Sequence, residues 1–184
     1  MRKRARLGAL GRIVLAAALV VAGAPARAQP SEDAVKAAFM PKFARYVQWP
    51  GTSHPAAHQA FVLCVIGRDP FGAQLDRAAA SEAIDGRTVT VRRLASPDGA
   101  TGCHIAFVRG PTAQDTARWL LALRSQPVLT ITDSRNGPQR GIIHFSVAAG
   151  RVRFLIDDAE AAARGLTISS RLLALALGVR QRRT

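Results

Sequence analysis

The 184-residue sequence has few acidic side chains, two cysteines and none of the common catalytic signatures. It has no G-x-S-x-G, H-E-x-x-H or G-x-G-x-x-G motif, so the usual marks of a serine hydrolase, a zinc protease and a dinucleotide-binding turn are missing. Gly67 and Gly72 have the outer spacing of a P-loop, but Ala73 and Gln74 stand where that motif requires Lys and Ser or Thr. We therefore predict a protein that is not an enzyme and holds no cofactor.

The sequence also lacks an apolar run long enough to cross a membrane. The run at residues 13–24 has about 12 residues, whereas a membrane-spanning helix needs roughly 20. Four basic residues at positions 2–6 precede it, and Ala26-Arg27-Ala28 follows with the A-x-A pattern of a cleavage site. We predict a signal peptide at 1–28, cleaved after Ala28, and a periplasmic mature chain. An uncleaved membrane anchor is the alternative.

Acidic residues are scarce throughout, with 12 Asp and Glu against 26 Lys and Arg. Residues 29–184 keep 20 basic and 12 acidic side chains, a formal charge of +8. The basic residues are dispersed and do not alternate with aromatic ones, and export separates them from nucleic acid, so we predict no nucleic-acid partner. A minority are suited to an acidic partner or to anionic lipid headgroups.

The two cysteines, Cys64 and Cys103, belong to a chain expected in an oxidising compartment. Each lies in or beside an apolar run, so neighbouring strands would bring them together. A disulfide closing a loop of about 40 residues would stabilise the fold by roughly 4 kcal/mol. We expect that disulfide, with two buried free thiols as the alternative. A metal site is disfavoured because Cys103 and His104 would point to opposite faces of a strand.

Apolar periodicity predicts a single domain at 29–184, in the α/β class: a mixed β-sheet with helices packed on both faces and a C-terminal β-hairpin plus helix. Ser31 caps a first helix that Pro41 should kink and Trp49-Pro50-Gly51 should end. Its apolar stripe is Val35, Phe39, Phe43, Tyr46 and Val47.

The remaining elements follow from runs, caps and turns. Strands are predicted at 61–67, 87–94, 104–109 and 128–132, helices at about 73–80 and 112–123, and a hairpin at 142–147 and 151–156. Asp157 and Glu160 begin a short helix that Gly165 ends. Ser169 caps a final helix that carries Leu172, Leu173, Leu175, Ala176 and Val179.

Histidines and Asp133 are the remaining candidates for chemistry. His54 and His58 occupy a proline-containing loop, so we predict surface histidines and no metal site. Asp133 follows a strand, where open sheets often hold sites, but no nucleophile or base is identifiable beside it and a turn-forming role is favoured. An exported hydrolase that uses Asp133, His104 and His144 is an alternative.

Five segments share a pattern that extends over nearly all of residues 29–184. They are Ala37–Pro50 (AAFMPKFARYVQWP), Leu63–Gly72 (LCVIGRDPFG), Cys103–Ile105, Gly150–Phe154 and Gly165–Leu173. In this order they resemble the YfiR family of bacterial periplasmic regulators.

The resemblance implies repression by protein–protein binding. A protein of this kind holds the periplasmic domain of an inner-membrane diguanylate cyclase inactive, which lowers cyclic di-GMP and limits biofilm growth. An OmpA-like outer-membrane lipoprotein can sequester the repressor, and other members serve sensor kinases. The resemblance also implies that Cys64 pairs with Cys103; a second disulfide found in some relatives has no counterpart here.

Such a repressor needs an exposed apolar patch and no nucleophile. We predict a partner-binding surface on the first helix and its exit: Phe39, Met40, Phe43, Tyr46 and Trp49. Packing of the same stripe against the sheet as ordinary core is the alternative. A surface of this kind also permits a homodimer.

A different class also stays open, a periplasmic small-molecule sensor that acts with a histidine kinase or another membrane partner. Its pocket would lie at the ends of the strands 61–67 and 128–133 and take an apolar or aromatic ligand.

Overall fold

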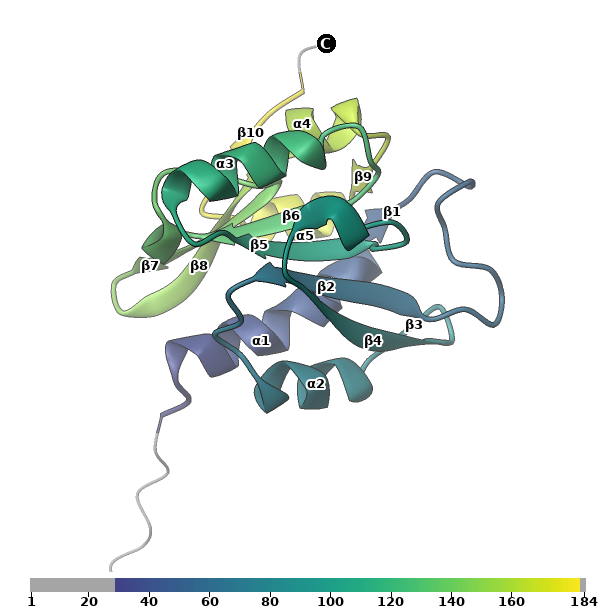
Figure 1. The fold of residues 1–184 in the computed structure, drawn as a ribbon, viewed down its shortest axis with the longest axis horizontal. Coiled ribbons are helices and arrows are strands. Elements are labelled where there is room, and N and C mark those ends of the chain that lie inside the picture. The colour runs from purple at the N-terminus through teal and green to yellow at the C-terminus, as the bar shows by residue number, and fades with distance from the viewer. Residues whose placement is uncertain (1–28, 183–184) are drawn as a thin grey trace, which may run out of the picture.

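The computed structural model describes residues 29–182, and the predicted signal peptide lies outside the described residues. These residues form an eight-stranded sheet with helices on both faces (Figure 1). From edge to edge, the strands are β10 (Gly178–Arg180), β8 (Arg151–Asp157), β7 (Ile143–Ala148), β6 (Leu129–Asp133), β5 (Ile105–Arg109), β2 (Phe61–Gly67), β4 (Arg87–Leu94) and β3 (Ala83–Ile84). Neighbours from β7 to β4 are parallel, β10 is parallel to β8, and β8 and β3 are antiparallel to β7 and β4. This confirms the predicted α/β fold with a mixed sheet.

Helices α1 (Glu32–Phe43) and α2 (Ala73–Ala80) cover one face of the sheet, and α3 (Ala113–Ala122) covers the other (Figure 1). Caps in the sequence decide where the first and third of these helices begin. The Ser31 hydroxyl accepts the N–H of Ala34 at 3.2 Å, and Thr112 and Asp115 form a reciprocal capping box. Both starts agree with the sequence predictions.

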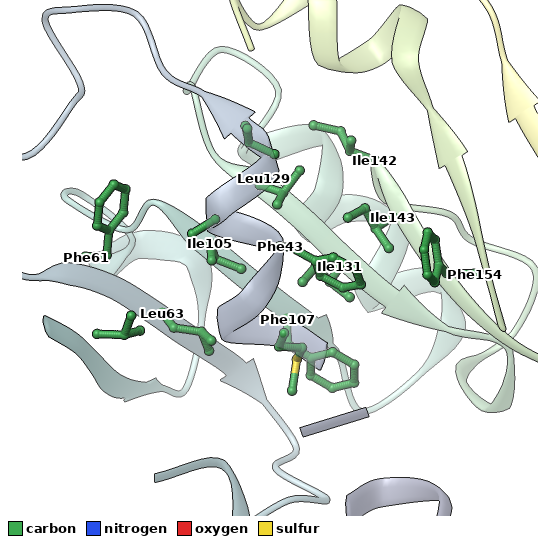
Figure 2. Close-up of a cluster of buried hydrophobic side chains, with 14 of the residues drawn as sticks. Phe43, Phe61, Leu63, Ile105, Phe107, Leu129, Ile131, Ile142, Ile143 and Phe154 are labelled. Carbon is green, nitrogen blue, oxygen red and sulfur yellow. The ribbon is translucent and has the colours of Figure 1, made fainter. Parts of the chain in front are cut away.

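The central strands are buried on both faces. Nearly all residues of β2 and β5 are apolar, and in β6 the hydroxyls of Thr130 and Thr132 accept backbone N–H groups, so their burial leaves them paired. Alternate side chains of β2 therefore belong to two cores, with Leu63 on the side of α1 and Ile66 on the side of α3. In the first core, the ring of Phe43 lies 5.8 Å from that of Phe145 and 5.3 Å from that of Phe154 (Figure 2). These contacts hold α1 against the sheet.

The C-terminal hairpin is confirmed. Two residues, Ala149 with φ 50° and Gly150 with φ 70°, join β7 to β8. Positive φ at both positions is typical of a type I′ turn, whose twist matches that of the flanking strands. Asp157 then caps α4 (Asp158–Ala163) by accepting the N–H of Glu160 at 2.8 Å.

The first helix is shorter than predicted. It ends at Phe43, continues as a 3-10 turn, η1 (Ala44–Tyr46), and gives way to β1 (Val47–Gln48). The strand forms because Val47 pairs with Ile168 of β9 (Thr167–Ile168), a partner that is distant in the sequence. Pro41 lies inside the last turn, so the chain tightens just after it and no long kinked helix forms.

The final helix is also shorter than predicted. Ser169 caps α5 (Ser170–Leu175), but Ala176 has an extended backbone and Val179 lies in β10. Val179 pairs with Ile156 of β8, so strand hydrogen bonds replace those of the expected helix. Ala176 and Val179 therefore belong to the sheet edge and the segment leading to it.

The predicted disulfide is present. Cys64, inside β2, joins Cys103, just before β5, with a Cα–Cα distance of 5.8 Å. Both cysteines are buried in the core on the side of α3. The guanidinium of Arg92 covers one edge of the bridge, with Nη2 3.1 Å from the sulfur of Cys103 and donating to the carbonyls of Gly99 and Thr101.

The double substitution Cys64→Ala/Cys103→Ala should destabilise the mature protein by about 4 kcal/mol, because the unfolded chain regains the entropy of a loop of about 40 residues. Urea denaturation of the variant and of the oxidised wild type measures the difference. Wild type reduced with dithiothreitol serves as the control and should lose a similar amount. Equal stability of oxidised and reduced wild type would contradict the prediction.

Candidate functional site

The structure divides the predicted partner-binding residues into two groups. Met40, Phe43 and Trp49 are core residues, with 0%, 2% and 7% of their surface exposed. Phe39 and Tyr46 are half-buried and remain within reach of a partner. The expectation of an exposed stripe is therefore corrected for the first three, because the sheet offers α1 a large apolar face to pack against. The binding role of Phe39 and Tyr46 stays a prediction.

Phe39 borders a groove between α1 and the β7–β8 hairpin. The groove has a volume of about 430 Å³, and its apolar wall consists of Val35, Phe39, Val147 and Val152. Val147 is 48% exposed, which makes it one of the most exposed large apolar side chains in the described part of the chain. Glu32 and Arg151 add one charge of each sign to the lining. An apolar groove with a charged border is a suitable shape for a protein partner.

The side chain of Trp49 is buried and packs against two neighbouring rings. Its ring lies 5.4 Å from that of Phe61 and 6.3 Å from that of His104. It therefore closes the core at the amino-terminal end of β2. Its indole Nε1 is buried and finds no acceptor among residues 29–182.

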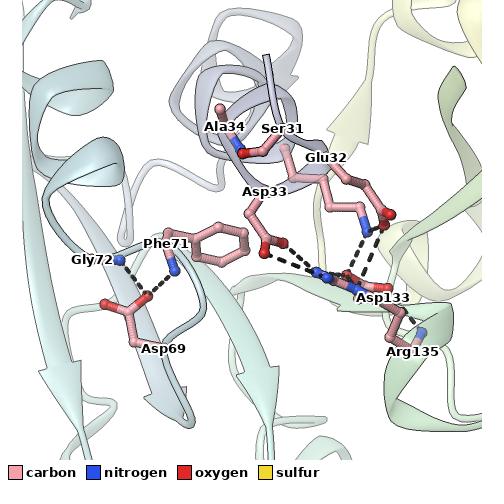
Figure 3. A network of polar contacts seen from close by, with 10 residues as sticks. Ser31, Glu32, Asp33, Ala34, Asp69, Phe71, Gly72, Asp133 and Arg135 are labelled. Carbon is pink, nitrogen blue, oxygen red and sulfur yellow. Dashed lines mark hydrogen bonds and ion pairs between the residues drawn. The ribbon is translucent and has the colours of Figure 1, made fainter. Parts of the chain in front are cut away.

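A buried ion network joins the start of α1 to the end of β6 (Figure 3). Lys36 is fully buried, and its Nζ lies 2.6 Å from Oδ2 of Asp133 and also pairs with Glu32. Arg135 lies 3.0 Å from the same carboxylate and pairs with Asp33. The network pairs each of its two cations with two carboxylates or more and ties the helix to the sheet.

Asp133 is ionised in this network. Burial by itself raises the pKa of Asp133, but the hydrogen bonds from Lys36 and Arg135 outweigh it and hold the pKa below the ordinary 3.8. Its Oδ1 accepts the N–H of Arg135 at 2.9 Å, which begins the 3-10 turn η3 (Ser134–Asn136). The predicted turn-forming role of Asp133 is confirmed, and the carboxylate also balances a buried lysine.

Lys36 is the residue that the sequence reasoning missed. A signal was present, because positions 36, 40 and 43 share one face of a helix and two of them are apolar core residues. A lysine on that face needs a buried counter-ion, and Asp133 at a strand end provides it.

The candidate catalytic residues of the hydrolase alternative do not converge. His104 precedes β5 and Asp133 ends β6, so they lie at opposite ends of two parallel strands. His144 has its own partner, with Nδ1 2.8 Å from the hydroxyl of Thr132. His58 is exposed and His54 packs on Phe61. No group of three metal-binding side chains occurs within residues 29–182.

The imidazole of His104 accepts a hydrogen bond that connects two strands. Its Nδ1 accepts the N–H of Val62 at 3.0 Å and thereby joins the amino-terminal ends of β2 and β5. Burial lowers the pKa of His104, and the neighbouring His54 adds to the effect. Burial also lowers the pKa of His144, with Arg140 as a second cause. Burial therefore disfavours the protonated form of both imidazoles.

The fold and these sites define a class of protein. It is an α/β domain in which the buried ion pairs stabilise the fold, and its accessible surface offers grooves and basic loops. A family model described as YfiR/HmsC-like matches residues 33–177, so the chain belongs to the YfiR/HmsC-like family. Comparison with curated proteins gives no match. Within residues 29–182, no helix is long and apolar enough to cross a membrane.

The substitution Asp133→Ala should lower the free energy of unfolding by about 3–5 kcal/mol, because it leaves Lys36 buried with only the partly exposed Glu32 as counter-ion. Urea denaturation at pH 7 measures the loss. Lys42→Ala is the control: that lysine is 54% exposed and lies 3.9 Å from Glu82, so its loss should stay below about 1 kcal/mol. Similar small losses in both variants would contradict a structural role for the network.

Stability should fall as the pH drops from 7 to 5. The pKa of His104 is lower in the folded state than in the unfolded chain, so protons bind the unfolded chain preferentially. The free energy of unfolding therefore begins to decrease below about pH 6.5, the ordinary pKa of histidine. Its slope is at most roughly 1.4 kcal/mol per pH unit for each such histidine. His104→Asn places an oxygen near Nδ1 without a titrating proton, so its unfolding free energy should depend less on pH. Urea titrations at several pH values test this. The exposed His58→Asn variant should keep the wild-type slope, and an unchanged slope in His104→Asn would contradict the assignment.

Proposed function

We propose that this protein is a periplasmic regulator of cyclic di-GMP signalling, which binds and inhibits the periplasmic domain of an inner-membrane diguanylate cyclase. The observation that carries the proposal is the YfiR/HmsC-like match across residues 33–177. The signal-peptide pattern at 1–28 and the disulfide between Cys64 and Cys103 support an oxidising, exported location. An OmpA-like outer-membrane lipoprotein as sequestering partner, and a homodimer, belong to the same proposal.

The groove beside Phe39 is the proposed contact with the cyclase. It combines a half-buried aromatic ring with the exposed Val147, and partner residues that fill it would bury both. Binding energy usually concentrates in a few apolar or aromatic anchors that become desolvated in a pocket. Tyr46 lies in the 3-10 turn η1 that follows α1 and is proposed as a second contact, outside the lining of the groove.

A small-molecule sensor is the second candidate, and one cavity favours it. A pocket of about 690 Å³ lies at the amino-terminal ends of β2, β5 and β6, where Val62, His104 and Val128 contribute to its lining. That volume falls within the range of about 300–1,000 Å³ for sites that take drug-sized ligands. A thermal-shift screen of metabolites on the mature protein, without a co-purifying membrane partner, distinguishes this candidate.

Deletion of the gene should raise cellular cyclic di-GMP when the cyclase is expressed, and wild-type protein supplied in the periplasm should restore the low level. Val147→Glu should fail to restore it, because a charge in the groove weakens binding by about 30-fold, the equivalent of losing one anchor of roughly 2 kcal/mol. The control is Leu121→Glu, a somewhat more exposed site (58% against 48% for Val147) on α3 at the opposite face of the sheet.

Cyclic di-GMP is measured by mass spectrometry, and periplasmic levels of each variant are compared by immunoblot. No rise on deletion would overturn the regulatory proposal. Full repression by Val147→Glu, with a rise on deletion, would place the contact elsewhere on the protein.

A further inference from the structure

The order of the parallel strands creates a switch point between β2 and β5. From β2 the chain passes through α2 to β4 on one side, whereas from β5 it passes through α3 to β6 on the other. Because the two connections leave in opposite directions, a crevice forms outside the carboxyl ends of these strands. Open α/β sheets commonly bind ligands at such a point.

An arginine lies at or just after the carboxyl end of each of three adjacent strands and lines this crevice. Arg68 follows β2, Arg109 ends β5 and Arg135 comes two residues after β6. All three line one cavity of about 190 Å³, together with Asn136 and the residues that begin α3. No acidic residue lines this cavity.

Two of the three guanidinium groups form no ion pair within residues 29–182. Arg135 is paired with Asp33 and Asp133, whereas the ion pairs found within residues 29–182 include neither Arg68 nor Arg109. The carboxylate of Asp115, nearby on α3, is engaged by Thr112 and Arg118. Two positive charges at the cavity therefore lack a counter-ion in the described part of the chain.

The side chain of Asn136 and the start of α3 bring further donors to the cavity. Asn136 Nδ2 is buried and has no acceptor among the described residues, and leaving a buried donor unsatisfied is unfavourable. The ten-residue helix α3 begins at the cavity, and the N–H groups of a first helical turn favour negative charge. The N–H groups of Thr112 and Asp115 already bond within the capping box, so a ligand rich in acceptor oxygens would meet the Asn136 amide and the arginines.

The backbone around the arginines is held in place. The N–H of Arg68 donates to the carbonyl of Arg109 at 2.9 Å, which joins the two strand ends. A Cβ at Gly67 would lie 2.2 Å from that carbonyl oxygen, so only glycine permits this approach. Arg68 and Arg109 therefore start from a fixed spacing, which lowers the entropy lost on binding.

The cavity has room for a small anionic group. At about 30 Å³ per water molecule, 190 Å³ corresponds to roughly six waters, below the range of about 300 Å³ and more for drug-sized ligands. Guanidinium groups bind phosphate oxygens in a bidentate manner. We propose that Arg68 and Arg109 bind a phosphate group at this switch point, either inorganic phosphate or the phosphate of a small monoester whose organic part stays outside. The site is independent of the proposed cyclase contact.

Isothermal titration of the oxidised mature protein tests the site, with inorganic phosphate and glycerol phosphate as separate probes. Arg68→Gln/Arg109→Gln should weaken binding at least about tenfold, because two charge-assisted contacts are lost. The matched control is Arg153→Gln/Arg171→Gln, which removes the same net charge from two exposed arginines outside the cavity and should bind as wild type does. Thermal unfolding without phosphate verifies that each variant folds.

Tighter binding of glycerol phosphate than of phosphate would assign the site to an ester, and the reverse would assign it to the free ion. Wild-type protein that binds neither probe at millimolar concentration would overturn the proposal. Equal weakening in the two double variants would also overturn it, because the binding would then reflect net charge alone.

Discussion

The burial of β2, β5 and β6 on both faces is the constraint on which the rest of the structure depends. Strands buried on both faces require a cover on each side, so α1 and α2 pack on one face and α3 on the other. Side chains of the strand interiors are thereby committed to the core. Polar chemistry is left to the strand ends and the loops between them.

The two ends of the parallel strands differ in chemistry. At the amino-terminal end, the disulfide and the hydrogen bond from Val62 to His104 join β2 to the start of β5 without any net charge. At the carboxyl end, arginines follow three adjacent strands and a buried lysine meets Asp133. One end is suited to stabilising the fold, and the other to contact with anions.

The groove beside α1 does not arise from the strand ends; it lies between the helix and the β7–β8 hairpin. The helix turns Met40 and Phe43 to the sheet, and this leaves Phe39 at the margin next to the hairpin. The hairpin projects beyond the helix and exposes Val147 there. A binding surface for a protein can therefore arise at the border of the core without a separate exposed stripe.

Much of the fold was predictable because the deciding signals are local. The continuous apolar run of β2, the caps at Ser31 and Thr112, and the turn before Arg151 are all read from residues a few positions apart. The site was less predictable, because Lys36 and Asp133 are 97 residues apart. Only their contact explains why a lysine and an aspartate are both buried. Arg68 and Arg109 likewise acquire a common role only through the strand order.

By itself, the sequence determined the class of fold through periodicity and caps, and it indicated the family through five matching segments. With two cysteines only one disulfide pairing was possible, and the tertiary structure decided between that bridge and two free thiols. Tertiary structure decided which apolar residues became core and which stayed accessible. It turned Val47 and Val179 into strand residues through pairing with Ile168 and Ile156. The physical reason is that hydrogen bonds and burial between remote segments outweigh the small local preference of a short segment for helix.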